Sequence, residues 1–187
     1  SELPSPSRFL SNYFWKSLDW ELIETELGQI NIFDIGCGDG NYYEKFSEYS
    51  KGRVKRYWGI DVEEHPNWKS VEQQGEGVGF EKVDMESDIS RFMPKGTNFI
   101  VSQSALEHFE EDLIVFRNLR RYTDQLTNSV IQIHLVPSEA CLYLYPLHGI
   151  RQYSTWTLKR IGKLFATNSY WEILGLGGAS SNRVHWQ

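Results

Sequence analysis

The sequence has little cysteine, no long hydrophobic run and a shortage of positive charge. Cys37 and Cys141 lie far apart and form no Cys-x-x-Cys pair, which argues against a disulfide-framed secreted module and against a zinc finger. No apolar run approaches the ~18 residues that a membrane span requires. Lys and Arg number 19 against 25 Asp and Glu, for a net charge of −6 and a pI near 5.4. A general nucleic-acid binder, which needs a basic face, is therefore not expected.

What is present suits one folded domain. The chain has 187 residues, of which 40% are hydrophobic and 24% charged, so it can bury a core without disulfides or metal. Only the aromatic content, 14%, is unusual. We expect a soluble protein of a reducing compartment, the cytoplasm. Its first residues, 1–6, lack the basic start and apolar core of a signal peptide and indicate a processed, tagged or excised terminus.

Hydrophobic periodicity predicts helices that alternate with strands. We expect strands at 30–35, 56–61, 79–84, 98–103, 129–136 and 170–176, and helices at 7–27, 41–49, 109–125 and 154–166, with a short helix between 62 and 79. Such alternation predicts an α/β fold with a doubly wound, mostly parallel, Rossmann-like sheet in three layers.

A glycine cluster, residues 36–40 (Gly-Cys-Gly-Asp-Gly), follows the first strand and opens a helix. Glycines let the backbone turn tightly and approach a ligand, and the helix that follows offers free N–H groups. A tight turn without a ligand explains the glycines equally well. The spacing differs from the Gly-x-Gly-x-x-Gly of dinucleotide domains, and Asp34 would repel a diphosphate but attract an ammonium group. Both points disfavour a nicotinamide-dependent oxidoreductase.

Carboxylates follow the next two strands. Asp61 closes the second strand, where a carboxylate can accept hydrogen bonds from both hydroxyls of a ribose. Asp84 follows the third strand and could accept from an adenine amino group, with Met85 packed on the ring. The alternative for each acid is an ordinary solvated side chain at a strand end.

These motifs, with the segment 99–108 (Phe-Ile-Val-Ser-Gln-Ser-Ala-Leu-Glu-His), resemble the class I S-adenosylmethionine-dependent methyltransferases of the type 11/12-like group. The resemblance covers about residues 29–136. It implies S-adenosyl-L-methionine as cofactor, S-adenosyl-L-homocysteine as product, and no metal. The cofactor-binding residues that it implies are Asp34, Gly36, Cys37 and Gly38 for the methionine end, Asp61 and Val62 for the ribose, Asp84 and Met85 for the adenine, and Gln103 and Ser104 beside the sulfonium.

The chain departs from the family pattern in two places. Asn98 stands where the family often has Asp at the start of its fourth strand. The family usually closes its sheet with an antiparallel hairpin, of which only 170–176 is clear, so the last antiparallel strand should be incomplete. We therefore expect an N-terminal helical segment, 1–28, and a methyltransferase domain, 29–187, truncated from a longer protein.

Methyl transfer requires alignment of the acceptor with the methyl group, and a hydroxyl acceptor also needs a base. His108, after the fourth strand, is the first candidate and His148, after the fifth, the second. The alternative for His108 is capping or packing of the next helix.

The segment 143–154 is where the family usually builds its acceptor pocket, and it is rich in aromatic residues. Its predicted substrate-binding residues are Tyr145, His148, Arg151 and Tyr153: aromatic rings suit sugars or planar acceptors, and Arg151 suits a phosphate or carboxylate. The segment is similar to one in methyltransferases of bacterial surface-polysaccharide assembly. The alternatives are a pocket lid, a sheet edge or a homodimer interface.

The resulting hypothesis is methyl transfer to a hydroxyl of a small-molecule or glycan acceptor, without nucleic acid or membrane partners. The runner-up is a non-catalytic scaffold or regulatory module, which cofactor titration distinguishes. The basic clusters at 51–56 and 117–121 are short and are interpreted as solvated faces rather than as an RNA-binding surface.

Overall fold

The computed structural model describes residues 5–85, 87–138, 151–165 and 169–176. Its centre is a five-stranded sheet of order β3-β2-β1-β4-β5, in which every neighbouring pair is parallel. The strands are β1 (Ile30–Ile35), β2 (Val54–Asp61), β3 (Val78–Lys82), β4 (Phe99–Gln103) and β5 (Ile131–Leu135). The predicted doubly wound α/β architecture is thus confirmed.

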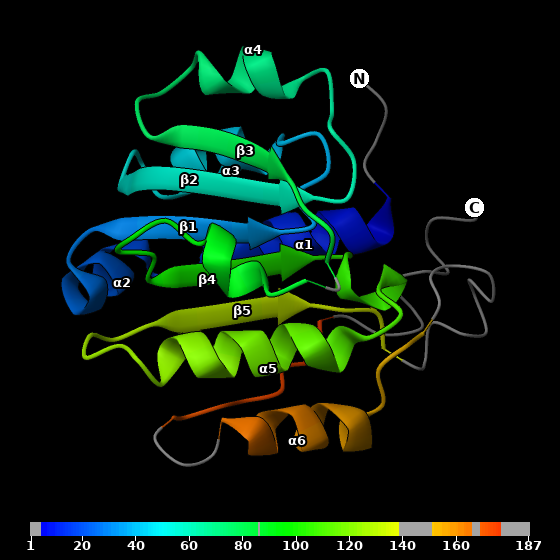
Figure 1. Ribbon diagram of the computed structural model, residues 1–187. Helices are drawn as coiled ribbons and strands as arrows, with labels where there is room; N and C mark the ends of the chain where they lie inside the picture. The colour runs from blue at the N-terminus through cyan, green and yellow to red at the C-terminus, as the bar shows by residue number, and fades with distance from the viewer. Residues whose placement is uncertain (1–4, 86, 139–150, 166–168, 177–187) are drawn as a thin grey trace.

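Helices cover both faces of this sheet (Figure 1). They are α1 (Pro6–Ser17), α2 (Trp20–Leu27), α3 (Tyr42–Tyr49), α4 (Trp68–Glu72), α5 (Asp112–Thr123) and α6 (Thr155–Leu164), with 3₁₀ turns η1 (Ile89–Phe92) and η2 (Leu106–His108). In Figure 1, α1, α2 and α3 lie behind the sheet, whereas η1 and α5 lie in front. No helix within the described ranges has the length and apolar character needed to cross a membrane.

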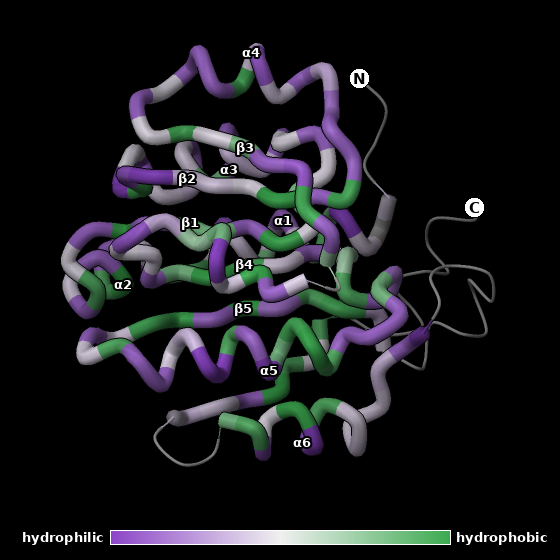
Figure 2. Tube along the Cα trace, viewed as in Figure 1, coloured by the Kyte–Doolittle hydropathy of each residue, from purple (hydrophilic) through white to green (hydrophobic). Residues whose placement is uncertain are grey.

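The hydrophobic core is divided by the sheet into two clusters. The rear cluster joins Trp15, Trp20 and Phe46 of the helices to Ile32 and Phe99 of the strands, all fully or nearly fully buried. The front cluster consists of Phe33, Ile35, Ile60, Ile100, Val115, Leu119 and others. Apolar residues on both strand faces produce the hydrophobic centre visible along β4 and β5 in Figure 2.

The prediction of a single helix over 7–27 is wrong, because two helices occupy this range. Leu18 is extended, with φ −63° and ψ 141°, and ends α1. Asp19 then caps α2 by accepting a hydrogen bond from the N–H of Leu22 at 3.0 Å. The break lets Trp15 and Trp20 both face the sheet, where the Trp20 indole N–H donates to the Trp15 carbonyl at 3.0 Å.

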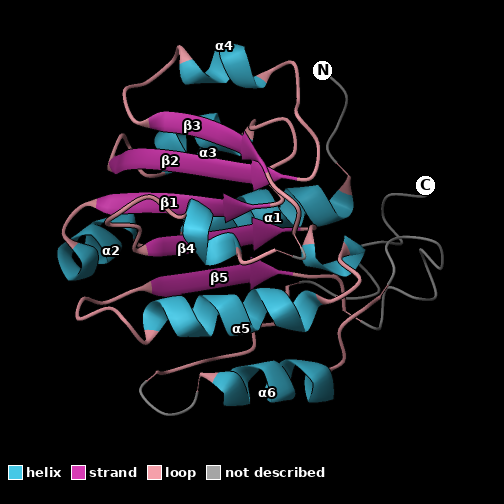
Figure 3. Ribbon diagram, viewed as in Figure 1, coloured by secondary structure: helices cyan, strands magenta, loops and turns pink. Residues whose placement is uncertain are grey.

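The sixth strand predicted at 170–176 is also wrong. Residues 169–176 form no strand pairing within the described part of the chain, and Figure 3 draws them as loop. Tyr170 and Leu174 are 87% and 60% exposed, while Trp171 lies over Gly162 of α6. An apolar pattern alone does not make a strand without a partner edge.

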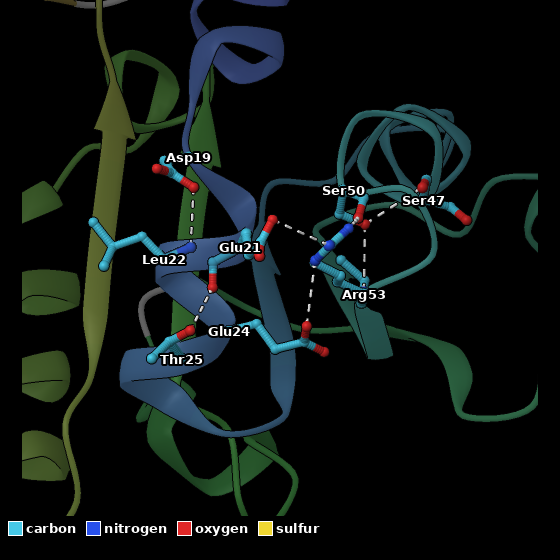
Figure 4. Close-up of polar contacts among 9 residues, drawn as sticks. Asp19, Glu21, Leu22, Glu24, Thr25, Ser47, Ser50 and Arg53 are labelled. Atoms are coloured by element: carbon cyan, nitrogen blue, oxygen red, sulfur yellow. Dashed lines mark hydrogen bonds and ion pairs between the residues drawn. The ribbon is translucent and has the colours of Figure 1, made fainter.

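An arginine connects α2 to the start of β2 (Figure 4). The Arg53 guanidinium lies 3.3 Å from a carboxylate oxygen of Glu24 and 3.7 Å from one of Glu21, and it donates to the Ser50 carbonyl at 3.1 Å. This member of the basic cluster at 51–56 therefore has intramolecular partners.

Candidate active site

The glycine turn joins the carboxyl ends of three strands. Gly36, Gly38 and Gly40 have left-handed φ values of 72°, 55° and 81°, which other residues adopt only with strain. The N–H groups of Gly36 and Cys37 both donate to the Ile60 carbonyl of β2, at 2.8 and 3.0 Å. A Cβ on Gly36 would lie 2.3 Å from the Cβ of Ala105, which follows β4, so this approach requires glycine.

Asp61 lies beside the turn, as predicted from its place at the end of β2. One carboxylate oxygen accepts the Gly38 N–H at 2.8 Å, and the other lies 3.9 Å from Nε2 of His65. The next side chain, Val62, is 50% exposed and offers an apolar surface at the same edge. A partly exposed carboxylate that is fixed by a backbone N–H suits the two hydroxyls of a ribose.

Asp34 is buried behind the turn. It is 4% exposed, and the Tyr57 hydroxyl donates to its Oδ2 at 2.5 Å. Burial raises the pKa of Asp34 to about 7, whereas the hydrogen bond from Tyr57 lowers that pKa and the charge of Asp61 raises it. Sequence reasoning missed Tyr57, which has the pattern of an ordinary strand residue.

The residues after β3 lie next to Asp61. The N–H of Val83 donates to the Asp61 carbonyl at 2.8 Å, which brings Asp84 and Met85 to the same end of the sheet. Met85 is buried, and Asp84 is exposed. Their placement is compatible with the predicted contacts to adenine.

Gln103, at the end of β4, is held from two helices. Its Oε1 accepts the indole N–H of Trp15 from α1 at 2.6 Å, and its Nε2 donates to the hydroxyl of Tyr42 from α3. Ser104 follows, exposed and in a left-handed conformation with φ 49°. Trp15 and Tyr42 are further site residues that no local motif indicated.

Residues in the connection between β2 and β3 donate hydrogen bonds to the glycine turn. The Trp68 indole N–H donates to the Gly38 carbonyl at 2.8 Å, and the amide of Asn67 donates to the Asp39 carbonyl at 3.0 Å. Trp68 stacks on Phe80, with ring centroids 5.2 Å apart. Burial raises the pKa of the Cys37 thiol far above its usual range, so this side chain packs under the turn and remains protonated.

The candidate bases differ in their exposure and in whether they lie within the described residues. His108 ends η2 and is exposed. His148 and Tyr145 lie outside the described residues. His134, on β5, is half-buried beside Phe116, and desolvation lowers the pKa of His134 to about 4. Its Nδ1 lies 2.8 Å from the Ser102 hydroxyl, a structural position.

Arg151 and Tyr153 take part in packing rather than facing an open pocket. Arg151 forms an ion pair with Asp112 and donates to the Glu110 carbonyl, both at the start of α5. Tyr153 is 2% exposed, and its hydroxyl donates to the same Asp112 carboxylate at 2.7 Å. Both residues were predicted to bind the acceptor; in the structure the Tyr153 hydroxyl and one Arg151 nitrogen contact Asp112, and the acceptor role of the two residues stays a prediction.

A cavity of about 730 Å³ lies at the other end of the strands, lined by Arg56, Trp58, Arg91, Phe92 and Lys95 among others. Ligands of open parallel sheets bind outside the carboxyl ends, so we place the site at the glycine turn instead. No group of His, Cys, Asp and Glu in the described ranges could hold a metal ion.

The residues at the turn fit S-adenosyl-L-methionine. The left-handed glycines leave room for close approach to the backbone, and Asp61 offers a fixed acceptor for ribose hydroxyls. Within the described ranges Asp34 forms no ion pair with a protein cation, which suits a positively charged ligand.

Comparison with known proteins bears on the family and the fold. A family model described as "Methyltransferase domain" matches residues 33–125. No curated protein matches the chain.

Among solved structures, the chain is similar to the YcgJ protein of Bacillus subtilis, with 18% identity, TM-score 0.55, and coverage of 81% of this chain and 67% of that one. It is similar to an S-adenosylmethionine-dependent methyltransferase of Aquifex aeolicus, with 19% identity, TM-score 0.50, and coverage of 86% and 87%. The plantazolicin methyltransferase BpumL, crystallised with S-adenosylhomocysteine, has 20% identity, TM-score 0.51, and coverage of 86% and 57%.

At these identities the solved structures establish the fold, and the matched domain establishes the family. The matched range contains Asp34 of β1, the glycine turn and Asp61 of β2. The chain belongs to the class I S-adenosyl-L-methionine-dependent methyltransferases.

Proposed function

We propose that this protein transfers a methyl group from S-adenosyl-L-methionine to a hydroxyl oxygen of a small-molecule or glycan acceptor. The observation that carries the proposal is the pair of carboxylates at the strand ends: Asp61, fixed by the Gly38 N–H at 2.8 Å, and the buried Asp34. When bound, the cofactor supplies an electrophilic methyl group on a cationic sulfur.

The two carboxylates would bind different groups of the cofactor. Asp61 would bind the ribose hydroxyls, with Val62 beside it, and Asp34 would bind the ammonium group. Met85 would contact the adenine ring and Asp84 its amino group. The glycine turn supports this by bringing backbone N–H groups to the same edge of the sheet. Gln103, fixed by Trp15 and Tyr42, would form the rear wall beside the methyl group.

The acceptor's proton must leave as its oxygen bonds to carbon, and we assign that proton to the imidazole of His108. Two features support this role: His108 is exposed, and it follows β4 directly in η2. Imidazole is the side chain best matched to proton transfer near neutral pH. Tyr145 and His148 remain predicted acceptor-side residues.

The test has a binding part and a turnover part. Calorimetry with S-adenosyl-L-homocysteine measures cofactor-site binding, and mass spectrometry after incubation with S-adenosyl-L-methionine and a panel of hydroxylated small molecules and oligosaccharides detects transfer. We expect binding, and a mass increase of one methylene on at least one acceptor.

His108→Ala should leave the affinity for S-adenosyl-L-homocysteine unchanged and lower turnover about 10²-fold or more. Glu111→Ala, at a neighbouring exposed position, is the matched control and should change neither. Binding without transfer to any acceptor would favour the non-catalytic module, and absence of binding would refute the cofactor assignment.

A further inference from the structure

We propose that Tyr57 is a positioning residue for the cofactor: its hydroxyl holds the Asp34 carboxylate in one orientation and in its ionised form for the ammonium group of S-adenosyl-L-methionine. The inference rests on the proposed function, because it requires this pocket to bind that cofactor.

The sheet register explains how the two side chains meet. Tyr57 of β2 pairs with Ile32, and Asp34 of β1 pairs with Gly59, so Tyr57 lies one pleat before Asp34 on the same face. From this position the phenol hydroxyl donates to Asp34 Oδ2 at 2.5 Å. A Cβ on Gly59 would lie 2.6 Å from the Cys37 sulfur and 2.8 Å from the Phe80 ring, so Cys37 and Phe80 pack directly on the glycine beside Asp34.

Aromatic packing fixes the donor. Tyr57 is fully buried, and its ring centroid lies 5.7, 6.3 and 5.8 Å from those of Tyr43, Phe46 and Phe80. A ring held on three sides has little freedom to withdraw its hydroxyl. The carboxylate of Asp34 is therefore held from behind by a rigid group.

This arrangement leaves one carboxylate oxygen for a ligand. Within the described ranges, the side-chain hydrogen bond to Asp34 comes from Tyr57 and falls on Oδ2, which leaves Oδ1 for a ligand. In the same ranges no Lys, Arg or His side chain forms an ion pair with Asp34. A buried carboxylate without a protein cation is a favourable place for an ammonium group, since low dielectric strengthens their attraction.

Burial and the charge of Asp61 oppose the ionisation of Asp34, and the hydrogen bond from Tyr57 favours it. The titratable groups that interact with Asp34 are Asp61 on β2, Cys37 in the turn and Tyr42 on α3, none of them cationic. Burial, and then the negative charge of Asp34, raises the pKa of Tyr57 well above 10, so its hydroxyl remains a donor at every working pH.

Removal of that donor has a predictable pH signature. With the Asp34 pKa near 7, Asp34 is protonated in a fraction of the protein molecules at neutral pH. Only the molecules in which Asp34 is ionised bind an ammonium group well. Without the Tyr57 hydroxyl the pKa of Asp34 should rise, which lowers the ionised fraction of Asp34 at low pH. At high pH Asp34 is ionised in both proteins, and the difference should vanish.

The experiment compares wild type, Tyr57→Phe and Tyr43→Phe by calorimetry with S-adenosyl-L-homocysteine at about pH 6 and about pH 8.5, either side of the Asp34 midpoint. The Tyr43 ring packs against that of Tyr57, so Tyr43→Phe removes the same hydroxyl group from a neighbouring, half-buried position. We expect Tyr57→Phe to weaken binding about tenfold at the lower pH and less than about twofold at the higher. Tyr43→Phe should have no effect at either. The ratio between proteins cancels the titration of the ligand itself.

If Tyr57→Phe lost the same factor of affinity at both pH values, the proposal would be overturned, because Tyr57 would then only support the structure. A wild type that binds at neither pH would instead refute the proposed function. Should Tyr57→Phe fail to fold, the comparison is made in Asp34→Asn, which contains no buried carboxylate. There the Tyr57→Phe change should alter affinity less than about twofold, and a tenfold loss would overturn the role.

Discussion

Asp61→Asn tests the cofactor site at its best-defined contact. The Asp61 carboxylate accepts the backbone N–H of Gly38 at 2.8 Å and that of Glu63 at 3.3 Å, and its side chain is 15% exposed. Asparagine has nearly the same shape but only one acceptor oxygen and no charge. That oxygen can continue to accept the Gly38 N–H, so the fold should persist while the ligand loses its acceptors.

The size of the effect follows from the hydrogen bonds removed. Two ribose hydroxyls would each lose a hydrogen bond to a charged group, and such bonds contribute about 1.5–3 kcal/mol each. The sum, about 3–6 kcal/mol, corresponds to a fall of about 10²- to 10⁴-fold in affinity. The exposed fraction of the carboxylate places the expectation toward the lower end of this range.

Calorimetry with S-adenosyl-L-homocysteine measures this fall, and thermal unfolding confirms that the variant is folded. Glu63→Gln is the matched control, because it removes an exposed carboxylate two residues away and should leave affinity unchanged. A folded Asp61→Asn protein whose affinity lies within about threefold of wild type would show that Asp61 does not bind the ribose.

Three further predictions concern stability and can be measured by urea unfolding. Gly36→Ala should destabilise far more than Gly38→Ala: both have left-handed φ, worth about 1–2 kcal/mol, but only at Gly36 does a Cβ clash, at 2.3 Å, and equal losses would contradict this. Tyr153→Phe should cost about 1–3 kcal/mol by removing a hydrogen bond to buried Asp112, without changing cofactor affinity. His134, whose folded pKa of about 4 lies below the ~6.5 of an unfolded histidine, should make stability decline as pH falls from about 6.5 to about 4. In His134→Gln that part of the decline should disappear, and an unchanged slope would contradict the burial argument.

The fold was predictable wherever the signal is local. Each strand of the parallel sheet is a short apolar run followed by a turn or helix, and this pattern is visible without tertiary information. The strand expected at 170–176 shows the limit: its residues have the composition of a strand, but pairing depends on an edge that composition does not specify. The break at Asp19 was visible only as a capping residue within an otherwise helical period.

The candidate site divides in the same way. The glycine turn and Asp61 could be predicted because both are visible in the local sequence. The left-handed backbone requires glycines, and the acid stands at the end of an apolar strand. The ion pair between Arg151 and Asp112 could not be predicted, because Asp112 is distant in sequence and meets Arg151 only after folding. Residue type indicates what a side chain can bind, whereas the fold determines which partner lies next to that side chain.

The aromatic surplus illustrates this competition between local and tertiary information. Its placement around a presumed acceptor pocket followed from the cluster in 143–154, yet many of the described rings pack around the cofactor turn. Trp15 reaches Gln103, Tyr57 reaches Asp34, and Trp68 reaches Gly38, each through a polar tip on an apolar body. Rings of this kind exclude water from the rear of the turn and at the same time supply hydrogen-bond donors there. The same burial that raises the pKa of Asp34 to about 7 therefore comes with the donor that opposes it, which links the composition of the core to the affinity of the pocket.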